Sequence, residues 1–195
     1  MMFHIFTYDQ IVEPSYMPMD GNTALASSPS LMRLINEADI LTHNVGTGLR
    51  KSAVESLMRL ALPYIKLGNL NDTEVNARGY ARKLLYSHPE GRFSVLALKW
   101  LPGACTPVHG HNAWGCVGVL DGEIGCETFA ACDEPSLAKS TGIINAKTGA
   151  VASVDPNPCG IHRLFNPTER ISHTLHIYGM DLSENPCAIN VPYRH

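Results

Sequence analysis

Charged residues are scarce in this chain, and neither sign dominates. Asp, Glu, Lys and Arg make up 17% of its 195 residues, and the net charge is -3. Such a chain has no general attraction to nucleic acid or to an anionic membrane. No apolar run is long enough to cross a bilayer, and segment 1–9 lacks the basic region and apolar core of a signal peptide. We therefore expect a cytoplasmic protein with neither nucleic acid nor membrane as a partner.

Closely spaced cysteine pairs are also missing. The six cysteines include no Cys-x-x-Cys motif, and a chain of this length does not need disulfide bonds to hold its core. Buried or half-buried free thiols are the expected state. The length fits one domain that buries roughly 70% of its unfolded surface. We expect residues 1–195 to form a single domain, present as a monomer or a small homo-oligomer.

Helical patterns occur in the first third of the chain. Ser28-Pro29 is typical of a helix start, with Ser28 as N-cap and Pro29 as the first helical residue. A second helical pattern runs from Lys51 to Leu62 and ends at Pro63, and Gly46-Thr47-Gly48 separates the two. These patterns predict a small helical cap within residues 1–78.

From Phe93 onward the pattern changes to short strands separated by turn signals. Strands are predicted over 93–101, 115–120, 123–129, 149–154 and 171–178, with a longer excursion over 130–148. Asp121-Gly122 is a strong hairpin signal. Short strands without helices between them favour a mainly β fold, a closed antiparallel barrel or jelly roll over residues 79–180. Residues 181–195 are expected to form a tail.

The most informative motif is a histidine pair. His109 and His111 are one residue apart in a predicted strand, so both imidazoles lie on one side of it. Such a pair presents two nitrogen ligands to one metal ion. His162 is the best candidate for a third ligand. Histidine ligands suit iron, zinc, nickel and manganese, so the ligand set does not fix the metal.

These histidines lie in a pattern that resembles the cupin motifs. The run from Gly103 through His109-x-His111 to Gly122 resembles the first motif, and His162-x-x-x-Asn166 resembles the end of the second. Most cupins place a glutamate ligand where this chain has Gly115. A histidine triad without a carboxylate resembles the thiol dioxygenases of the cysteine dioxygenase family, which implies a cupin (jelly-roll) β-barrel.

Two further motifs carry this resemblance. Tyr80-x-Arg82 is similar to a family motif whose arginine pairs with the substrate carboxylate, and a guanidinium fork suits that task. Near the end of the barrel, Thr174-x-His176-x-Tyr178 lies on one face of the predicted strand 171–178. It resembles a Ser-x-His-x-Tyr relay that holds a tyrosine hydroxyl over the iron, and threonine keeps the hydroxyl.

The resemblance implies an Fe(II) enzyme that adds both atoms of O2 to a small thiol carboxylic acid to give a sulfinic acid. In that role His109, His111 and His162 bind the metal, Arg82 and Tyr80 bind the substrate, and Thr174, His176 and Tyr178 assist catalysis. L-Cysteine ranks first as substrate because of Arg82. The His-x-His-x-x-Trp-Gly run resembles bacterial enzymes that oxidise 3-mercaptopropionate, and mercaptosuccinate would also use an arginine.

Some family members carry a cysteine cross-linked to the tyrosine that Tyr178 resembles. Cys116 lies one residue beyond the equivalent position, Gly115, and its side chain is therefore expected on the opposite face of the strand. We expect no thioether between Cys116 and Tyr178.

Two other classes of function remain open for this sequence. A different metal-dependent cupin enzyme would use the same triad without needing Arg82 or Tyr178. A non-catalytic small-molecule-binding cupin would bind a thiol without consuming oxygen.

Overall fold

The described part of the chain, residues 28–67, 70 and 73–195 of this computed structural model, contains two α-helices followed by ten strands. The helices are α2 (Pro29–Asn44) and α3 (Thr47–Ala61), and a short 3-10 helix, η1 (Leu62–Tyr64), follows α3. The strands are β1 (Tyr80–Ser87), β2 (Ser94–Trp100), β3 (His109–His111), β4 (Gly115–Asp121), β5 (Glu123–Ala131), β6 (Ala138–Lys147), β7 (Val151–Val154), β8 (Ile161–Phe165), β9 (Ser172–Tyr178) and β10 (Asn190–Pro192). The expectations for residues 1–27 lie outside the described residues.

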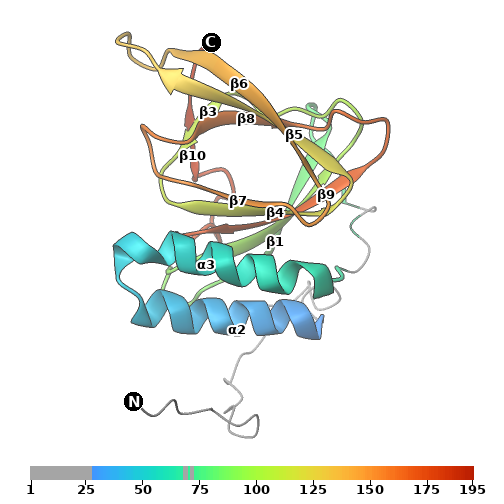
Figure 1. The fold of residues 1–195 in the computed structure, drawn as a ribbon, viewed down its shortest axis with the longest axis vertical. Helices are drawn as coiled ribbons and strands as arrows, with labels where there is room; N and C mark the ends of the chain where they lie inside the picture. The colour runs from blue at the N-terminus through green and yellow to red at the C-terminus, as the bar shows by residue number, and fades with distance from the viewer. Residues whose placement is uncertain (1–27, 68–69, 71–72) are drawn as a thin grey trace, which may run out of the picture.

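The strands form two antiparallel sheets that face each other (Figure 1). One sheet has the order β1-β2-β9-β4-β7, and the other has the order β10-β3-β8-β5-β6. The two helices lie outside the first sheet, where α3 contacts β4 and β7. This arrangement confirms the predicted mainly β jelly roll with a small helical layer at its N-terminal side.

The helix starts follow from local sequence. Ser28 is the N-cap of α2 and Pro29 its first residue, although the Ser28 side chain makes no capping hydrogen bond. The predicted break at Gly46 is correct, but Thr47 already belongs to α3. Each helix buries one apolar face, which carries Leu34 in α2 and Met58 in α3. These faces pack in one core cluster with Ile177 of β9.

Region 130–148 contains strand β6, so the excursion predicted there is wrong. This strand pairs with β5 at the edge of its sheet and is exposed over almost its whole length. An edge strand that buries neither face needs no apolar alternation, so its sequence carries no period-two signal. Strands β1 and β10 were also not anticipated; β10, within the expected tail, pairs with β3.

Successive side chains of strand β9 point to opposite sides of its sheet. Leu175 and Ile177 point to the helices, whereas Thr174, His176 and Tyr178 point between the sheets, and all five are buried. The polar face predicted for this strand therefore faces the interior of the barrel rather than water.

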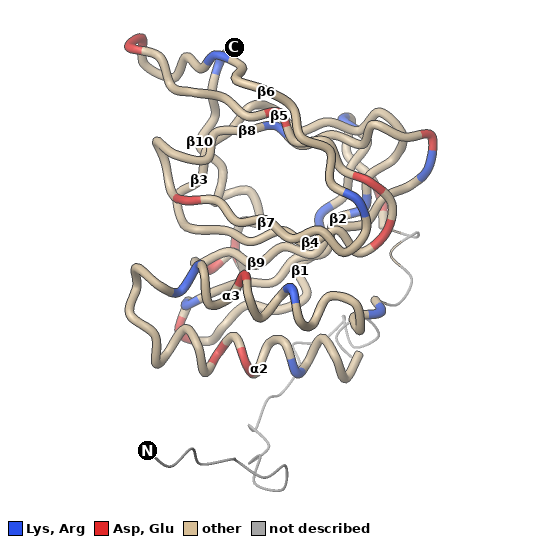
Figure 2. Tube along the Cα trace, viewed as in Figure 1, with Lys and Arg blue, Asp and Glu red and all other residues tan. Residues whose placement is uncertain are grey.

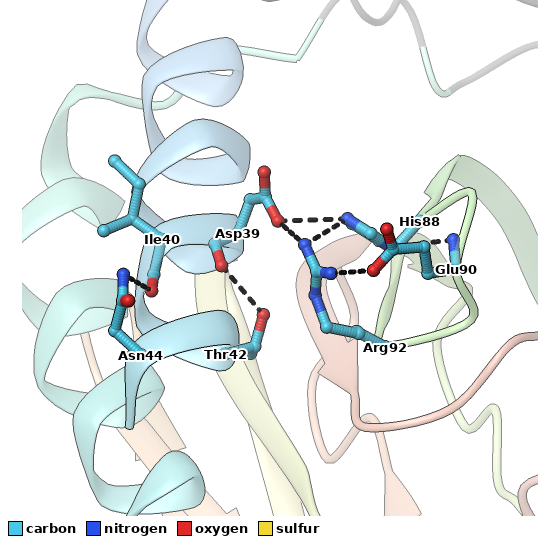
Figure 3. A network of polar contacts seen from close by, with 7 residues as sticks. All are labelled: Asp39, Ile40, Thr42, Asn44, His88, Glu90 and Arg92. Carbon is cyan, nitrogen blue, oxygen red and sulfur yellow. Dashed lines mark hydrogen bonds and ion pairs between the residues drawn. The ribbon is translucent and has the colours of Figure 1, made fainter. Parts of the chain in front are cut away.

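Charged residues lie mainly on the helices and the turns (Figure 2). Within the described residues, no helix is both long and apolar enough to cross a membrane. One polar network ties α2 to the turn between β1 and β2 (Figure 3). There the Asp39 carboxylate pairs with Arg92 and lies 3.0 Å from Nε2 of His88, and Arg92 also pairs with Glu90. His88, for which the sequence suggested no role, therefore helps to anchor the helical layer.

Candidate metal centre

Three histidines converge between the two sheets. His109 and His111 extend from β3, and His162 extends from β8, which pairs with β3 so that His109 lies opposite His162. The ring centroids are 5.0 Å apart for His109 and His111, and 4.8 Å apart from each of these to His162. One nitrogen from each ring lies within 4.8 Å of the other two, and all three residues are buried. The structure thus brings together the three predicted ligands.

These imidazoles are held in the neutral form that metal coordination requires. Burial lowers the pKa of His109 to about 4 and that of His111 to about 3, and it lowers the pKa of His162 as well. Nδ1 of His109 lies 2.9 Å from the carbonyl oxygen of Pro107, so this nitrogen carries the proton and donates it. Nε2 of His109 is therefore left with a free lone pair for a metal. The donor set and its burial fit a single divalent transition metal.

The buried histidines predict acid sensitivity of the metal-free protein. His176 has the same shift, to a pKa of about 3. Because the folded-state pKa values lie below the unfolded value of 6.5, the unfolded chain binds more protons, and stability falls as pH drops through 6.5. Over the first pH unit below 6.5 we expect the free energy of unfolding to fall by at least about 3 kcal/mol, roughly 1 for each of His109, His111 and His176, and buried His162 adds to the loss. Urea unfolding in the presence of a chelator measures this loss, and a free energy that stays constant down to pH 5.5 would contradict it.

A chain of hydrogen bonds leads from the core to Tyr178. Nε1 of Trp100 donates to Oγ1 of Thr174 at 2.9 Å. The same oxygen lies 2.8 Å from Nε2 of His176, and Nδ1 of His176 lies 2.9 Å from the Tyr178 hydroxyl. All four residues are buried.

The direction of the first bond in this chain is fixed by its donor. An indole N–H can only donate, so the Thr174 hydroxyl accepts from it and has one proton left. Among these contacts that proton has one acceptor, Nε2 of His176. When that proton goes to Nε2, the neutral His176 ring carries its proton on Nδ1 and donates it to the Tyr178 oxygen. With the other His176 tautomer, Nε2–H donates to Thr174 and the Tyr178 hydroxyl donates to Nδ1. Only the first arrangement leaves the Tyr178 hydroxyl proton free to point elsewhere. The Tyr178 ring centroid is 6.2 Å from that of His111.

Arg82 lies on β1, at the seam between the sheets where the chain end passes. Nη1 donates to the Pro186 carbonyl at 2.9 Å, and Nη2 lies 3.5 Å from Oδ1 of Asn190. Nε is buried and has no partner among the described residues. The guanidinium lies 5.9 Å from the ring centroid of Tyr80, which stacks on Trp100 at 5.3 Å. Burial is the main cause of the lowered pKa values of His109 and His111. The positive charge of Arg82 lowers both pKa values further.

Gly115 makes room for Tyr178. The two residues are register partners on β4 and β9, and a Cβ at position 115 would lie 2.8 Å from carbon atoms of the Tyr178 ring. Cys116 points to the other side, where its sulfur lies 3.6 Å from the carbonyl oxygen of Lys51 in α3. The position of Cys116 therefore agrees with the expectation that its side chain and Tyr178 lie on opposite faces.

This geometry predicts that Cys116 and Tyr178 remain unlinked after exposure to iron and oxygen. Mass spectrometry of a tryptic digest should show the two peptides separately, each at its unmodified mass. A cross-linked species, lighter than their sum by two hydrogen atoms, would contradict the observed placement of Cys116.

Asn166, the end of the second cupin-like motif, has a structural position. Its Nδ2 donates to the carbonyl oxygens of Trp100, Leu101 and Arg170 at 3.1, 3.2 and 2.6 Å. Its Oδ1 accepts from Thr168. Asn166 thus fixes the turn between β8 and β9, which carry His162 and the Tyr178 chain.

Several residues of the site were not found from the sequence. Trp100 starts the hydrogen-bond chain, the Pro107 carbonyl orients His109, and Pro186 and Asn190 hold Arg82. A tryptophan in a predicted strand indicates only core packing. The residue type does not indicate which backbone carbonyls accept hydrogen bonds from side chains. The chain end had no motif that connected it to Arg82.

Comparison with known proteins agrees with this geometry. Residues 68–186, more than half of the chain, match the family model described as cysteine dioxygenase type I. Among solved structures, a Cupin_2 domain of an XRE family transcriptional regulator from Enterobacter cloacae is 16% identical, with a TM-score of 0.40 over 51% of this chain and 95% of that one. A double-stranded β-helix protein from Klebsiella pneumoniae is 13% identical, with a TM-score of 0.48 over 67% and 99%. An oxalate oxidase is 16% identical, with a TM-score of 0.44 over 59% of each chain.

Proposed function

Because the chain belongs to the cysteine dioxygenase type I family, we propose that this metal-dependent cupin enzyme is an Fe(II) thiol dioxygenase acting on a small thiol carboxylic acid, with L-cysteine as the first substrate to test. The family is one of thiol dioxygenases, and the fold and the histidine triad are those of a metal-binding cupin. The metal, the thiol and the sulfinic acid product belong to the proposal.

The observation that carries the proposal is a neutral histidine triad with a cationic donor near it. His109, His111 and His162 would hold the iron through neutral nitrogens. Arg82 offers a buried Nε–H without a partner among the described residues, and this donor fits a substrate carboxylate. Bound Fe(II) would supply open coordination positions where the substrate sulfur and O2 meet.

The overall reaction is RSH + O2 → RSO2H. Both oxygen atoms end on sulfur, which loses four electrons while O2 gains four, so no further reductant is needed. In this scheme Arg82, backed by Tyr80, binds the carboxylate and holds the thiol in one orientation toward the triad. Such positioning makes the encounter effectively intramolecular.

Tyr178 is the proposed hydrogen-bond donor to the reacting atoms. The contacts among Thr174, His176 and Tyr178 allow the tautomer in which His176 donates to the Tyr178 oxygen. We assign this tautomer to the active enzyme, because it leaves the Tyr178 hydroxyl free to donate toward the reacting oxygen atoms. Burial raises the pKa of Tyr178, which keeps the hydroxyl protonated at neutral pH. We assign Tyr178 the role of hydrogen-bond donor, with His176 and Thr174 as its positioning residues.

Tyr178→Phe should lower kcat about tenfold, because it removes one hydrogen bond made to the reacting atoms. Bound iron should stay at one ion per chain, since Tyr178 is not a ligand. Steady-state oxygen uptake together with iron analysis measures both quantities, and Tyr64→Phe, at an exposed position, is the matched control. An unchanged kcat in the Tyr178 variant would remove this residue from the mechanism.

The proposed function is tested by oxygen uptake of the Fe(II)-loaded protein with L-cysteine, 3-mercaptopropionate and mercaptosuccinate in parallel. We expect uptake with a thiol carboxylate and a product heavier than the thiol by two oxygen atoms. The preferred thiol identifies the substrate within this class. Stoichiometric iron without uptake on any of them would point to a different cupin chemistry or to a binding protein.

A further inference from the structure

A second approach to the triad lies far from Arg82. Strands β1 and β10 are the edge strands at one seam between the two sheets, and β7 and β6 are the edge strands at the other. Arg82 of β1 and Asn190 of β10 occupy the first seam. A pocket of about 600 Å³ opens at the second seam, and its walls come from β4, β5, β6, β7 and β8.

The lining of this pocket is apolar. Its walls include the interior-facing side chains of Val117, Ile124, Ala146, Val154 and Leu164. Its charged residues lie at strand ends, because Lys147 is the last residue of β6 and Asp155 follows β7. Strands β4 and β7 carry no charge other than Asp121 at the end of β4 (Figure 2).

The pocket reaches the triad at His162, which is one of its wall residues. A small space of about 10 Å³ lies against His111, His162, His176 and Tyr178. It shares four wall residues with the large pocket, which are Val117, Val154, His162 and Leu164. A space of that size holds about one water-sized molecule. Both spaces therefore end at His162, so a small apolar molecule in the large pocket would lie beside a triad residue.

We propose that this apolar pocket is the route by which O2 reaches the candidate metal centre, while the thiol carboxylate arrives at the Arg82 seam. This inference rests on the proposed dioxygenase function. O2 is uncharged and enters an apolar pocket without a desolvation penalty, whereas a carboxylate would lose its hydration there without a partner. Separate approaches would let both substrates reach one face of the triad without blocking each other.

The kinetic test uses two variants, Ala146→Phe on β6 and Ala152→Phe on β7. Each of them narrows the pocket from a different side. Each added ring has free volume to occupy, so the fold is expected to tolerate it. Ile143→Phe is the matched control, because Ile143 lies on β6 but is exposed and does not line the pocket. We expect kcat/KM for O2 to fall at least about fivefold in the two pocket variants, with KM for the thiol and iron content unchanged.

Xenon provides a readout that does not depend on turnover, because it binds empty apolar cavities. Crystals pressurised with xenon should show an occupied site in the pocket of the wild-type protein and of Ile143→Phe, and loss of that site in Ala146→Phe. A wild-type pocket without xenon overturns the inference. So does a pocket variant that raises KM for the thiol and leaves kcat/KM for O2 unchanged, since the pocket would then hold part of the substrate. If no thiol supports oxygen uptake, the proposed function fails, and xenon occupancy still decides whether the pocket admits an apolar gas.

Discussion

Replacing His162 by alanine should abolish stoichiometric iron binding and lower thiol-dependent oxygen uptake by at least about 1,000-fold, because two imidazoles cannot replace a three-ligand site as a platform for metal catalysis. His162 is the ligand supplied by the second strand, so its loss leaves only the pair from β3. The measurement combines iron content after desalting with oxygen-electrode rates at saturating thiol.

The matched control for this variant is His173→Ala. His173 lies on β9 and is not part of the triad. We expect this variant to keep one iron per chain and near wild-type rates. Urea unfolding of the metal-free His162 variant shows whether the fold is kept, which separates loss of the ligand from loss of the structure. Full iron binding by the His162 variant would refute the assigned ligand set.

Replacing Arg82 by alanine should lower kcat/KM for a thiol carboxylate by about 100- to 1,000-fold, which corresponds to one or two charge-assisted hydrogen bonds to the carboxylate. Iron content should not change, because Arg82 is not a ligand. Lys83→Ala is the control, because this neighbour on β1 points to the opposite face of the strand.

Arg82 also holds the chain end through Pro186 and Asn190, so its replacement has a structural consequence that must be separated from substrate binding. A thiol without a carboxylate, 2-aminoethanethiol, makes this separation. If Arg82 binds the carboxylate, the variant loses its rate on the thiol carboxylate and keeps its slow rate on 2-aminoethanethiol. Equal losses on both thiols would assign Arg82 to the positioning of the chain end instead.

Sequence alone was sufficient where spacing along one strand fixes the geometry. His109 and His111 share a side of β3, and Thr174, His176 and Tyr178 share a side of β9, because alternation in a strand has a period of two residues. The same rule placed Cys116 opposite Gly115. The helical layer was predictable because α2 and α3 bury one apolar face each.

Tertiary structure decided what depends on contacts between distant segments. Strand β6 is exposed at a sheet edge, and β10 is a short strand near the chain end, so neither carries an apolar pattern. The partners of Arg82 are more than 100 positions away in the chain, and the hydrogen-bond chain that ends at Tyr178 starts from Trp100 on a neighbouring strand. The apolar pocket exists only because two sheet edges stay apart at the β6 and β7 seam. Local periodicity determines which side chains share a face, whereas sheet pairing determines which faces meet, and in this protein the site lies where two faces meet.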